Sequence, residues 1–141
     1  VLAGSLLNLK AVAAAIPPQA SVGIVCAGTG GRFSLDDAFV AGRFVQLLAG
    51  ERSDAARVAE RLAEAYPDPA EALGDASHAQ SLRATGQASD IGFCARESVL
   101  DVVPGVESVE EGVAAVVPWS KVNGPSNTDS LTPMNQAKTL N

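Results

Sequence analysis

The stretch Val22-Gly-Ile-Val-Cys-Ala-Gly-Thr-Gly-Gly-Arg-Phe-Ser-Leu-Asp-Asp37 joins an uncharged apolar run to a glycine-rich turn and then to the start of a helix. We predict a strand over residues 22–27, with Val22, Ile24 and Cys26 on one face and the intervening residues on the other. Neither face carries a charge, which is typical of a parallel strand covered by helices on both sides. We expect a ligand beyond the carboxyl end of this strand.

The turn after the predicted strand has the composition of an anion-binding loop. Gly28, Gly30 and Gly31 permit positive φ angles and a close approach of the backbone to a ligand. Ser34 and Asp37 have the spacing of a capping box, which would fix the start of the helix and leave amides that favour a phosphate, sulfonate or carboxylate. The stretch matches neither the nucleotide-binding nor the dinucleotide-binding glycine motif, so a plain tight turn is the alternative.

Composition limits the class of protein. The chain has 141 residues, of which 47% are hydrophobic, enough for one domain with an apolar core. The net charge of −6, the pI near 4.6 and the absence of a basic stripe in the sequence argue against nucleic acid or an anionic membrane as a partner. The apolar start of the chain is interrupted by Asn8 and Lys10 and is too short to span a bilayer.

The two cysteines predict a cytoplasmic protein. Cys26 and Cys94 lie on separate apolar segments, and the chain contains one histidine. This pattern fits reduced, buried thiols better than a disulfide framework or a zinc site.

Hydrophobic spacing and stop signals predict a helix-rich α/β fold. The expected helices span residues 4–16, 35–49 and 53–66 and are followed by short helices that begin at Asp68, Ser77 and Asp90. In the third helix, Val58 and Leu62 are predicted on the buried face. Short β-branched runs at residues 99–103 and 113–117 are predicted strands. We expect layered helices around a small, mostly parallel sheet, as an incomplete piece of a larger α/β domain.

The chain divides into a predicted domain over residues 1–119 and a predicted flexible tail over residues 120–141, which show no hydrophobic periodicity. Val1 falls inside a helical pattern, and the predicted strands are few for the number of helices. We therefore expect a missing N-terminal segment. The chain is expected to form a homo-oligomer or to pair with that segment, with the helix at residues 4–16 in the shared surface.

Several short motifs occur in a single order along the chain: Gly4-Ser-Leu-Leu-Asn8, Val25-Cys-Ala-Gly-Thr29, Phe33-Ser-Leu-Asp-Asp37, Ser77-His78 and Val103-Pro104. This order resembles the C-terminal half of the 2-phosphosulfolactate phosphatases of coenzyme M biosynthesis. The resemblance implies a magnesium-dependent α/β phosphatase that hydrolyses 2-phospho-3-sulfolactate to 3-sulfolactate and phosphate. The chain departs from the family pattern at Asp36, where glutamate is typical, and at Ala79, where glycine is usual.

The resemblance also implies roles for individual residues. Asp36 and Asp37 are the expected catalytic acids and Mg²⁺ ligands, with helix capping as the alternative. The residues expected to bind the substrate are Ser5, Asn8, Gly28, Thr29, Gly30, Gly31, Arg32, Ser34 and His78.

Two functions remain open at this point. The first is a Mg²⁺-dependent phosphatase for a small phosphorylated acid, in which metal and amides neutralise charge while water attacks phosphorus. The second is a non-catalytic α/β fragment that binds an anion or a partner subunit. An in-frame continuation of the gene upstream of Val1 would favour the first function, and a true start at Val1 would favour the second.

Overall fold

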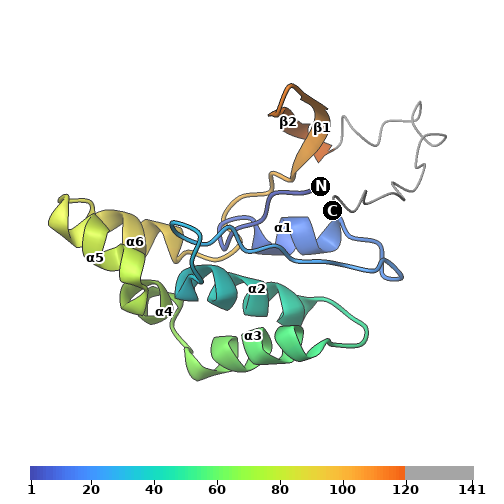
Figure 1. Cartoon of the computed structure of the whole chain (residues 1–141). Helices are drawn as coiled ribbons and strands as arrows, with labels where there is room; N and C mark the ends of the chain where they lie inside the picture. Colours follow the sequence, from blue (N-terminus) through green and yellow to red (C-terminus); the bar gives the residue numbers. More distant parts are fainter. Residues whose placement is uncertain (120–141) are drawn as a thin grey trace, which may run out of the picture.

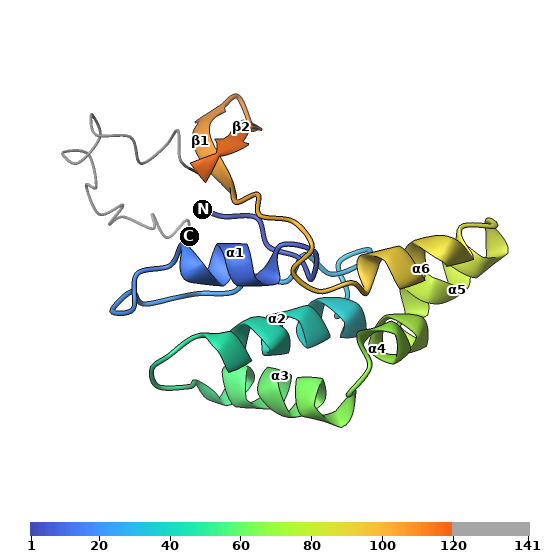
Figure 2. The same cartoon turned by 180° about the vertical axis from the view of Figure 1, so that it is seen from behind.

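The computed structural model describes residues 1–119, so the tail predicted at residues 120–141 lies outside the described residues. The elements are α1 (Leu9–Ala14), α2 (Leu35–Leu47), α3 (Asp54–Ala65), α4 (Pro69–Asp75), α5 (Ser77–Ala84), α6 (Ala88–Cys94), β1 (Pro104–Glu110) and β2 (Val113–Pro118). Helices α1, α2 and α3 are stacked, α4 to α6 gather at one end, and the β1–β2 hairpin projects from the α1 side (Figures 1 and 2). The α/β class is confirmed.

The core of residues 1–119 has two clusters, one around Phe39 between α2 and α3 and one between α1 and α2 that contains Leu9, Val12 and Phe44. Phe39 is fully buried and meets the Tyr66 ring edge-to-face, with ring centroids 6.2 Å apart. Gly42 lets the two helices approach closely, because a Cβ at this position would overlap the carbonyl oxygen of Ala59 and lie 2.9 Å from the Ala63 Cβ. The predicted helix from residue 35 is therefore confirmed, and a glycine in its middle is explained by packing.

Two of the predicted helix starts are confirmed by their caps. The Ser53 hydroxyl accepts the Ala56 amide at 3.2 Å, and an Asp68 carboxylate oxygen accepts the Ala70 amide at 2.9 Å. Ser77 caps nothing, because the buried Ala76 occupies the cap position of α5 and packing fixes where that helix begins.

The cap predicted at Asp90 is also wrong. Gly86, with φ of 78°, ends the preceding helix, and Gln87 occupies the cap position of α6. Asp90 therefore falls inside the first turn of α6.

The buried face of α3 differs from the prediction. Ala63 is 2% exposed, whereas Val58 is 70% exposed. Val58 instead lines an open groove beside α2 and α3. The spacing of apolar residues predicted the helix correctly. It could not show that no other element of residues 1–119 packs against Val58.

The first helix is shorter than predicted because Asn8 holds residues 3–8 in a non-helical turn. Its side-chain oxygen accepts the Ser5 amide at 2.8 Å, and its nitrogen donates to the carbonyl oxygens of Ala3 and Val102 at 3.2 and 3.1 Å. Leu6, before the helix, is only 2% exposed. The apolar residues Leu6, Leu9 and Val12 are covered within the chain and expose no apolar stripe, and the place of this region in a shared surface stays a prediction.

The strand predicted at residues 22–27 is absent from the described structure. These residues run as an extended segment between α1 and α2 (Figure 1). Within residues 1–119, the backbone of residues 21–27 makes no hydrogen bond. A strand requires a neighbouring backbone, and the described part of the chain offers none. The predicted burial of Cys26 is wrong for the same reason, and Cys94 is exposed as well.

The sheet in the described residues is a two-stranded antiparallel hairpin, so the predicted mostly parallel sheet is wrong for this part of the chain. Its turn at Glu111 and Gly112 has φ of 50° and 82°, the positive values that a type I′ turn requires. The strand predicted at residues 113–117 is confirmed, but the one at 99–103 is wrong. Strand β1 begins instead at Pro104, because proline is tolerated as the first residue of a strand.

The start of the chain extends this hairpin. The Val106 amide donates to the Val1 carbonyl, and the Ala3 amide donates to the Pro104 carbonyl, both at 2.9 Å. Leu2 consequently forms an antiparallel bridge with Gly105. No helix within residues 1–119 has the length and apolarity needed to cross a membrane.

Candidate functional site

The glycine-rich turn is closed by two backbone hydrogen bonds. The Thr29 amide donates to the Arg32 carbonyl at 3.0 Å, and the Arg32 amide donates back at 3.2 Å. Between them, Gly30 and Gly31 have φ of 59° and 73°, and Gly28 before the turn has φ of 71°. These values confirm the expected positive φ angles, which residues with a Cβ rarely adopt.

The acidic start of α2 faces this turn. An Asp37 carboxylate oxygen accepts the Gly28 amide at 2.6 Å, and the Ser34 hydroxyl donates to the Asp36 carboxylate. The Thr29 and Ser34 hydroxyl oxygens are 3.5 Å apart. The structure thus brings together eight of the predicted site residues within one turn and one helix start: Gly28, Thr29, Gly30, Gly31, Arg32, Ser34, Asp36 and Asp37.

The predicted capping box is not formed. Ser34 occupies the cap position of α2, but its side chain accepts no helix amide. The Asp37 carboxylate reaches across to Gly28 instead of back to the Ser34 amide. The residue types of a capping box are present, but the adjacent glycine turn supplies a competing donor.

The hydrogen bonds leave few backbone amides for a ligand. The Gly28 amide is taken by Asp37, and the Thr29 and Arg32 amides close the turn. In the part of the chain that the structure describes, the Gly30 and Gly31 amides have no partner, and both glycines are exposed. Within the turn, these two amides are therefore open to an anion, and the first-turn amides of α2 likewise make no side-chain cap hydrogen bond within residues 1–119.

The metal-ligating capacity of the turn rests on two carboxylates, Asp36 and Asp37, which are both half-buried. Residues 1–119 contain no cluster of three or more His, Cys, Asp or Glu side chains able to hold a metal ion. Mg²⁺ is usually held by one or two carboxylates together with water and substrate phosphate. The acidic pair fits that requirement but is not a complete cage.

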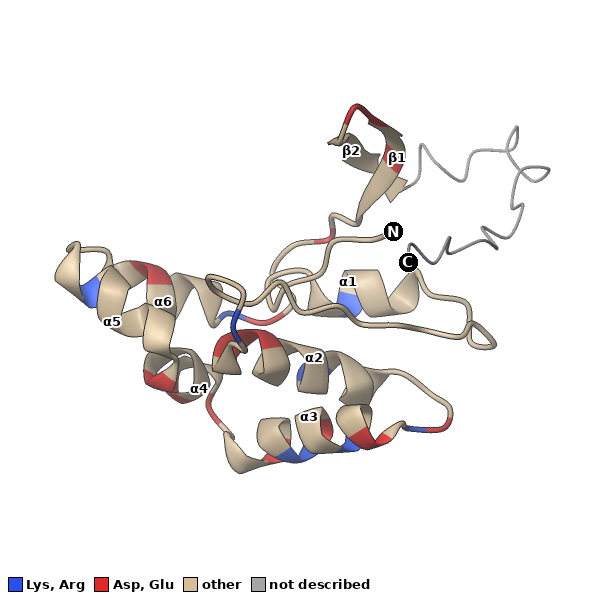
Figure 3. Ribbon diagram, viewed as in Figure 1, with Lys and Arg blue, Asp and Glu red and all other residues tan. Residues whose placement is uncertain are grey.

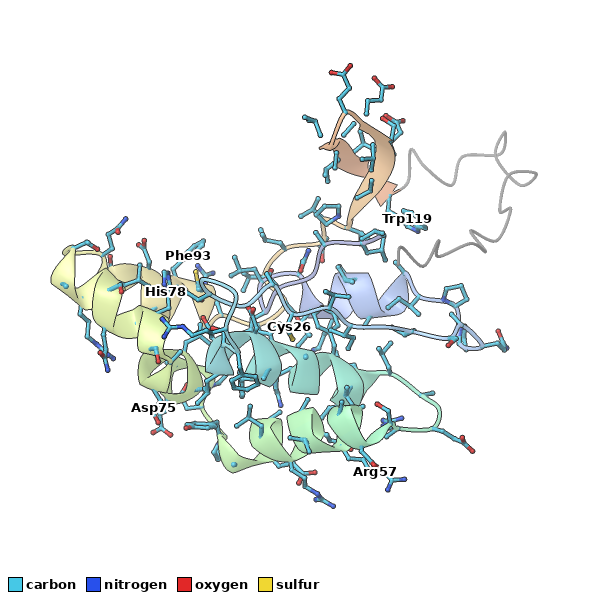
Figure 4. The ribbon with its side chains drawn as sticks, in the orientation of Figure 1. Cys26, Arg57, Asp75, His78, Phe93 and Trp119 are labelled. Carbon is cyan, nitrogen blue, oxygen red and sulfur yellow. The ribbon has the colours of Figure 1, made fainter. Side chains whose placement is uncertain are left out.

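The remaining predicted site residues have other surroundings. Asn8 is 5% exposed, and its side-chain oxygen and nitrogen are both used to hold the turn before α1. The Ser5 amide and hydroxyl both donate to the Asn8 oxygen. Arg32 is exposed at the closing position of the turn, and His78 is exposed on α5 (Figure 4). No hydrogen bond in residues 1–119 joins Ser5, Asn8 or His78 to the turn, so their substrate contacts stay predictions.

Cys26 lies next to this turn, on the extended segment above α2 (Figure 4). Partial burial, and secondarily the charge of Asp37, raise the pKa of the Cys26 thiol above its ordinary value of 9.0. A raised pKa keeps the sulfur protonated at neutral pH, which makes it a poor nucleophile. Cys26 is therefore poorly suited to accept a phosphoryl group.

An ion pair that the sequence did not reveal connects α2 to the segment after α6. The Arg43 guanidinium donates two hydrogen bonds to the Glu97 carboxylate, at 2.6 and 2.8 Å. These hydrogen bonds raise the pKa of Arg43 further above its ordinary value. The partners are 54 residues apart, so no local spacing could have indicated the pair.

A large concavity borders the extended segment. It has a volume of about 830 Å³ and lies between residues 20–26 and the helices α2 and α3. We call it the α2–α3 groove. Its lining is mostly apolar, with Glu51 and Arg52 at one end. Basic residues are scattered over the described part of the molecule and form no stripe (Figure 3).

Comparison with known proteins identifies relatives of this chain. The sequence model of a family described as 2-phosphosulpholactate phosphatase matches residues 1–109. Proteins named "Probable 2-phosphosulfolactate phosphatase" are 39% identical in Thermotoga petrophila and 40% identical in Thermus thermophilus, in both cases over 74% of this chain. The matched region makes up 47% and 46% of those two proteins, so the chain spans about half the length of these curated relatives.

Proposed function

The chain belongs to the 2-phosphosulfolactate phosphatase family, and we propose that it forms the phosphate-binding part of an enzyme that hydrolyses 2-phospho-3-sulfolactate or a similar small phospho-acid. The chain covers about half of its relatives, so the proposal applies to the domain completed by the remaining half. The products would be the hydroxy acid and inorganic phosphate.

The observation that carries this proposal is the hydrogen bond between the Asp37 carboxylate and the Gly28 amide, 2.6 Å long. It holds an acidic helix start against a glycine turn that has two open amides. A phosphatase needs donors for the phosphate oxygens and negative groups for a cation at the same place. The turn and the helix start supply both.

Each group in the turn has a proposed task. The Gly30 and Gly31 amides and the Thr29 hydroxyl would donate to phosphate oxygens. The exposed Arg32 would pair with the phosphate or the sulfonate, which a guanidinium binds through two parallel hydrogen bonds. The Ser34 hydroxyl and the Gly28 amide become available to the ligand when Asp36 and Asp37 bind a cation.

Mg²⁺ is the cation we propose for Asp36 and Asp37. When bound, it would neutralise part of the charge on the phosphoryl group. In the structure, the Ser34 hydroxyl and the Gly28 amide hold these two carboxylates beside the turn, and the carboxylates would exchange these contacts for the cation. Ser5, Asn8 and His78 remain proposed substrate contacts that depend on the completed domain.

The proposal extends to association and location. We propose that residues 1–119 form one half of a domain and that this half associates with the complementary segment or with a second copy. A cytoplasmic location is also proposed, and the two free cysteines support it.

A second candidate function, a non-catalytic fragment that binds a partner subunit, is favoured by one observation. Residues 21–27 present a backbone that is unpaired within residues 1–119. If the Gly28 amide stayed hydrogen-bonded to Asp37 in every state of the protein, the turn would serve to hold residues 21–27 in place and not to bind a ligand.

Phosphate release distinguishes the two functions. The chain is combined with the part of the Thermus thermophilus relative that it does not align with, and the mixture is given 2-phospho-3-sulfolactate. We expect phosphate release in Mg²⁺ and none in EDTA, restored by added Mg²⁺. Equal release in both conditions would contradict the metal assignment, and no release in either would favour the binding function.

A further inference from the structure

We propose that residues 21–27 are a docking strand, onto which a strand of the complementary half of the family domain pairs. The inference deepens the proposed function and rests on it, because that half is the segment that would complete the enzyme. Its occupant is a polypeptide backbone with apolar side chains, not a small molecule.

The backbone of the docking strand is ready to pair. Residues 21–27 are extended, and with the rest of residues 1–119 their amides and carbonyls form no hydrogen bond. Extended backbone in a folded protein is usually hydrogen-bonded, because an unpaired strand edge recruits another strand. Pairing of main-chain groups is how a β-strand adds to an open edge.

The side chains of the docking strand follow strand geometry although no sheet is present. Ile24 and Cys26 line the α2–α3 groove, whereas Val25 between them is absent from its lining and is 92% exposed; Val22 lines the groove as well, next to Ser21 and Gly23. Alternation between two apolar faces is the pattern of a strand inside a sheet that is covered on both sides.

The surface around the docking strand is also unusually apolar. Phe33 is 81% exposed, and Val58, across the groove, is 70% exposed. Both line the α2–α3 groove together with the docking strand. A continuous apolar surface of this kind marks a contact with another polypeptide.

The length of the relatives and the two unpaired edges of the docking strand favour the complementary half as the occupant. The relatives are about twice as long as the matched region, so the family domain includes a second half of similar size. A strand with two open edges and two apolar faces needs neighbours on both edges. Two copies of this chain pairing edge to edge would satisfy one edge of each strand, whereas a segment with several strands would satisfy both.

The lining of the groove argues against a small anionic ligand. The charged lining residues are Glu51 and Arg52, and Arg52 already donates to the carbonyls of Val45 and Leu48 at 2.9 Å. A doubly charged phospho-acid would find little to neutralise it there. The apolar side chains of a strand would match the lining.

Amide hydrogen exchange tests this inference directly. The probe is the part of the Thermus thermophilus relative that does not align with this chain, which we expect to be its N-terminal half. We expect the amides of residues 22–27 to exchange rapidly in the chain alone and at least about tenfold more slowly in the mixture. Unchanged exchange at these residues, despite binding of the probe, would overturn the docking strand.

Two matched variants distinguish a specific contact at the docking strand from nonspecific hydrophobic binding. Val25→Asp places a charge on the docking strand, and Val113→Asp places the same charge on the hairpin, on a valine that is 72% exposed. We expect Val25→Asp to weaken probe binding at least about tenfold and Val113→Asp to leave it within about twofold. Equal effects of the two variants would overturn the inference.

Two further outcomes are informative. Protection of residues 22–27 in the chain alone at high concentration, with dimerisation, would assign the docking strand to a second copy and overturn the proposed occupant. Protection by the probe without any phosphate release would support the docking strand while contradicting the proposed function, so the two failures are distinguishable.

Discussion

The Asp37 carboxylate connects the glycine turn to α2, and its charge also acts on the neighbouring thiol. Asp37 and partial burial both raise the pKa of Cys26 above 9.0. Asp37→Asn removes one of these causes, so more thiolate is present at pH 8 and iodoacetamide should modify Cys26 faster. Because the folded pKa is the higher one, Cys26 contributes stability below pH 9.0 that is lost as the pH rises through the folded pKa.

The control for this measurement is Asp54→Asn, which removes an exposed charge from the first turn of α3. Its Cys26 modification rate should equal that of the unchanged chain, with Cys94 replaced by serine in all samples. An unchanged rate in Asp37→Asn would contradict the placement of Asp37 beside Cys26.

The Arg43–Glu97 pair is the strongest ionic contact in the described residues that joins distant segments. Its side chains are 29% and 27% exposed, and the bond is bidentate. Glu97→Gln should lower the free energy of unfolding by about 1 kcal/mol in urea denaturation. Glu64→Gln, which breaks the exposed Arg61–Glu64 pair, should leave it unchanged. Equal losses in both variants would show that the Arg43 bond adds nothing specific.

Sequence reasoning reached some residues of the site and not others. The glycines of the turn were predictable because positive φ angles favour glycine. The partner of Asp37 was not, because the capping-box spacing favours the Ser34 amide, and only the folded turn brings the Gly28 amide, nine residues away in the chain, within reach. Glu97 was unpredictable as a partner of Arg43 because long-range packing brings them together.

Among the helices, Gly42 and Gly92 provide a matched comparison of a packed and an unpacked glycine. A Cβ on Gly42 in α2 would collide with the Ala59 carbonyl, whereas a Cβ on Gly92 in α6 would meet nothing within 4 Å. Gly42→Ala should destabilise the chain by about 2 kcal/mol despite better helix propensity, through overpacking. Gly92→Ala should stabilise it by up to about 1 kcal/mol. Thermal melts of both variants test the α2–α3 packing, and a stabilised Gly42→Ala would contradict it.

The helix α1 region supplies a second test at this scale. Leu6 is 2% exposed and belongs to the core with Phe39 and Ala63. Leu6→Asp should therefore abolish the cooperative melt, because it buries a charge without a partner. Ala14→Asp, at an exposed position of α1, should change the free energy of unfolding by no more than about 0.5 kcal/mol. A normal melt of Leu6→Asp would show that this region is not part of the core.

Helices were predicted better than strands for a physical reason. Helix hydrogen bonds are local, so spacing and caps at Ser53 and Asp68 were sufficient. A strand depends on a partner, and the partner of β1 is β2 together with the first residues of the chain. The apolar run at residues 22–27 has the sequence of a strand, but residues 1–119 contain no backbone to complete it.

At the scale of the whole molecule, residues 1–119 form a mostly helical body with a covered core and one open apolar side. The core around Phe39 is complete, whereas the α2–α3 groove and the docking strand are not covered within residues 1–119. The candidate site lies at the end of that docking strand, at Gly28. Completion of the sheet would therefore fix the position of the glycine turn relative to the rest of the domain.

We propose above that Asp36 and Asp37, beside the glycine turn, are functional acids and not only helix caps. The most direct measurement is the rate of phosphate release from 2-phospho-3-sulfolactate by the completed domain in Mg²⁺, with Asp36→Asn, Asp37→Asn and the control Asp54→Asn. We predict that the first two variants lose at least about a hundredfold in kcat while still binding the complementary half, and that the control keeps full activity. Full activity in Asp36→Asn and Asp37→Asn, with a stability loss of about 1 kcal/mol, would show that both residues only support the helix start and would contradict the claim.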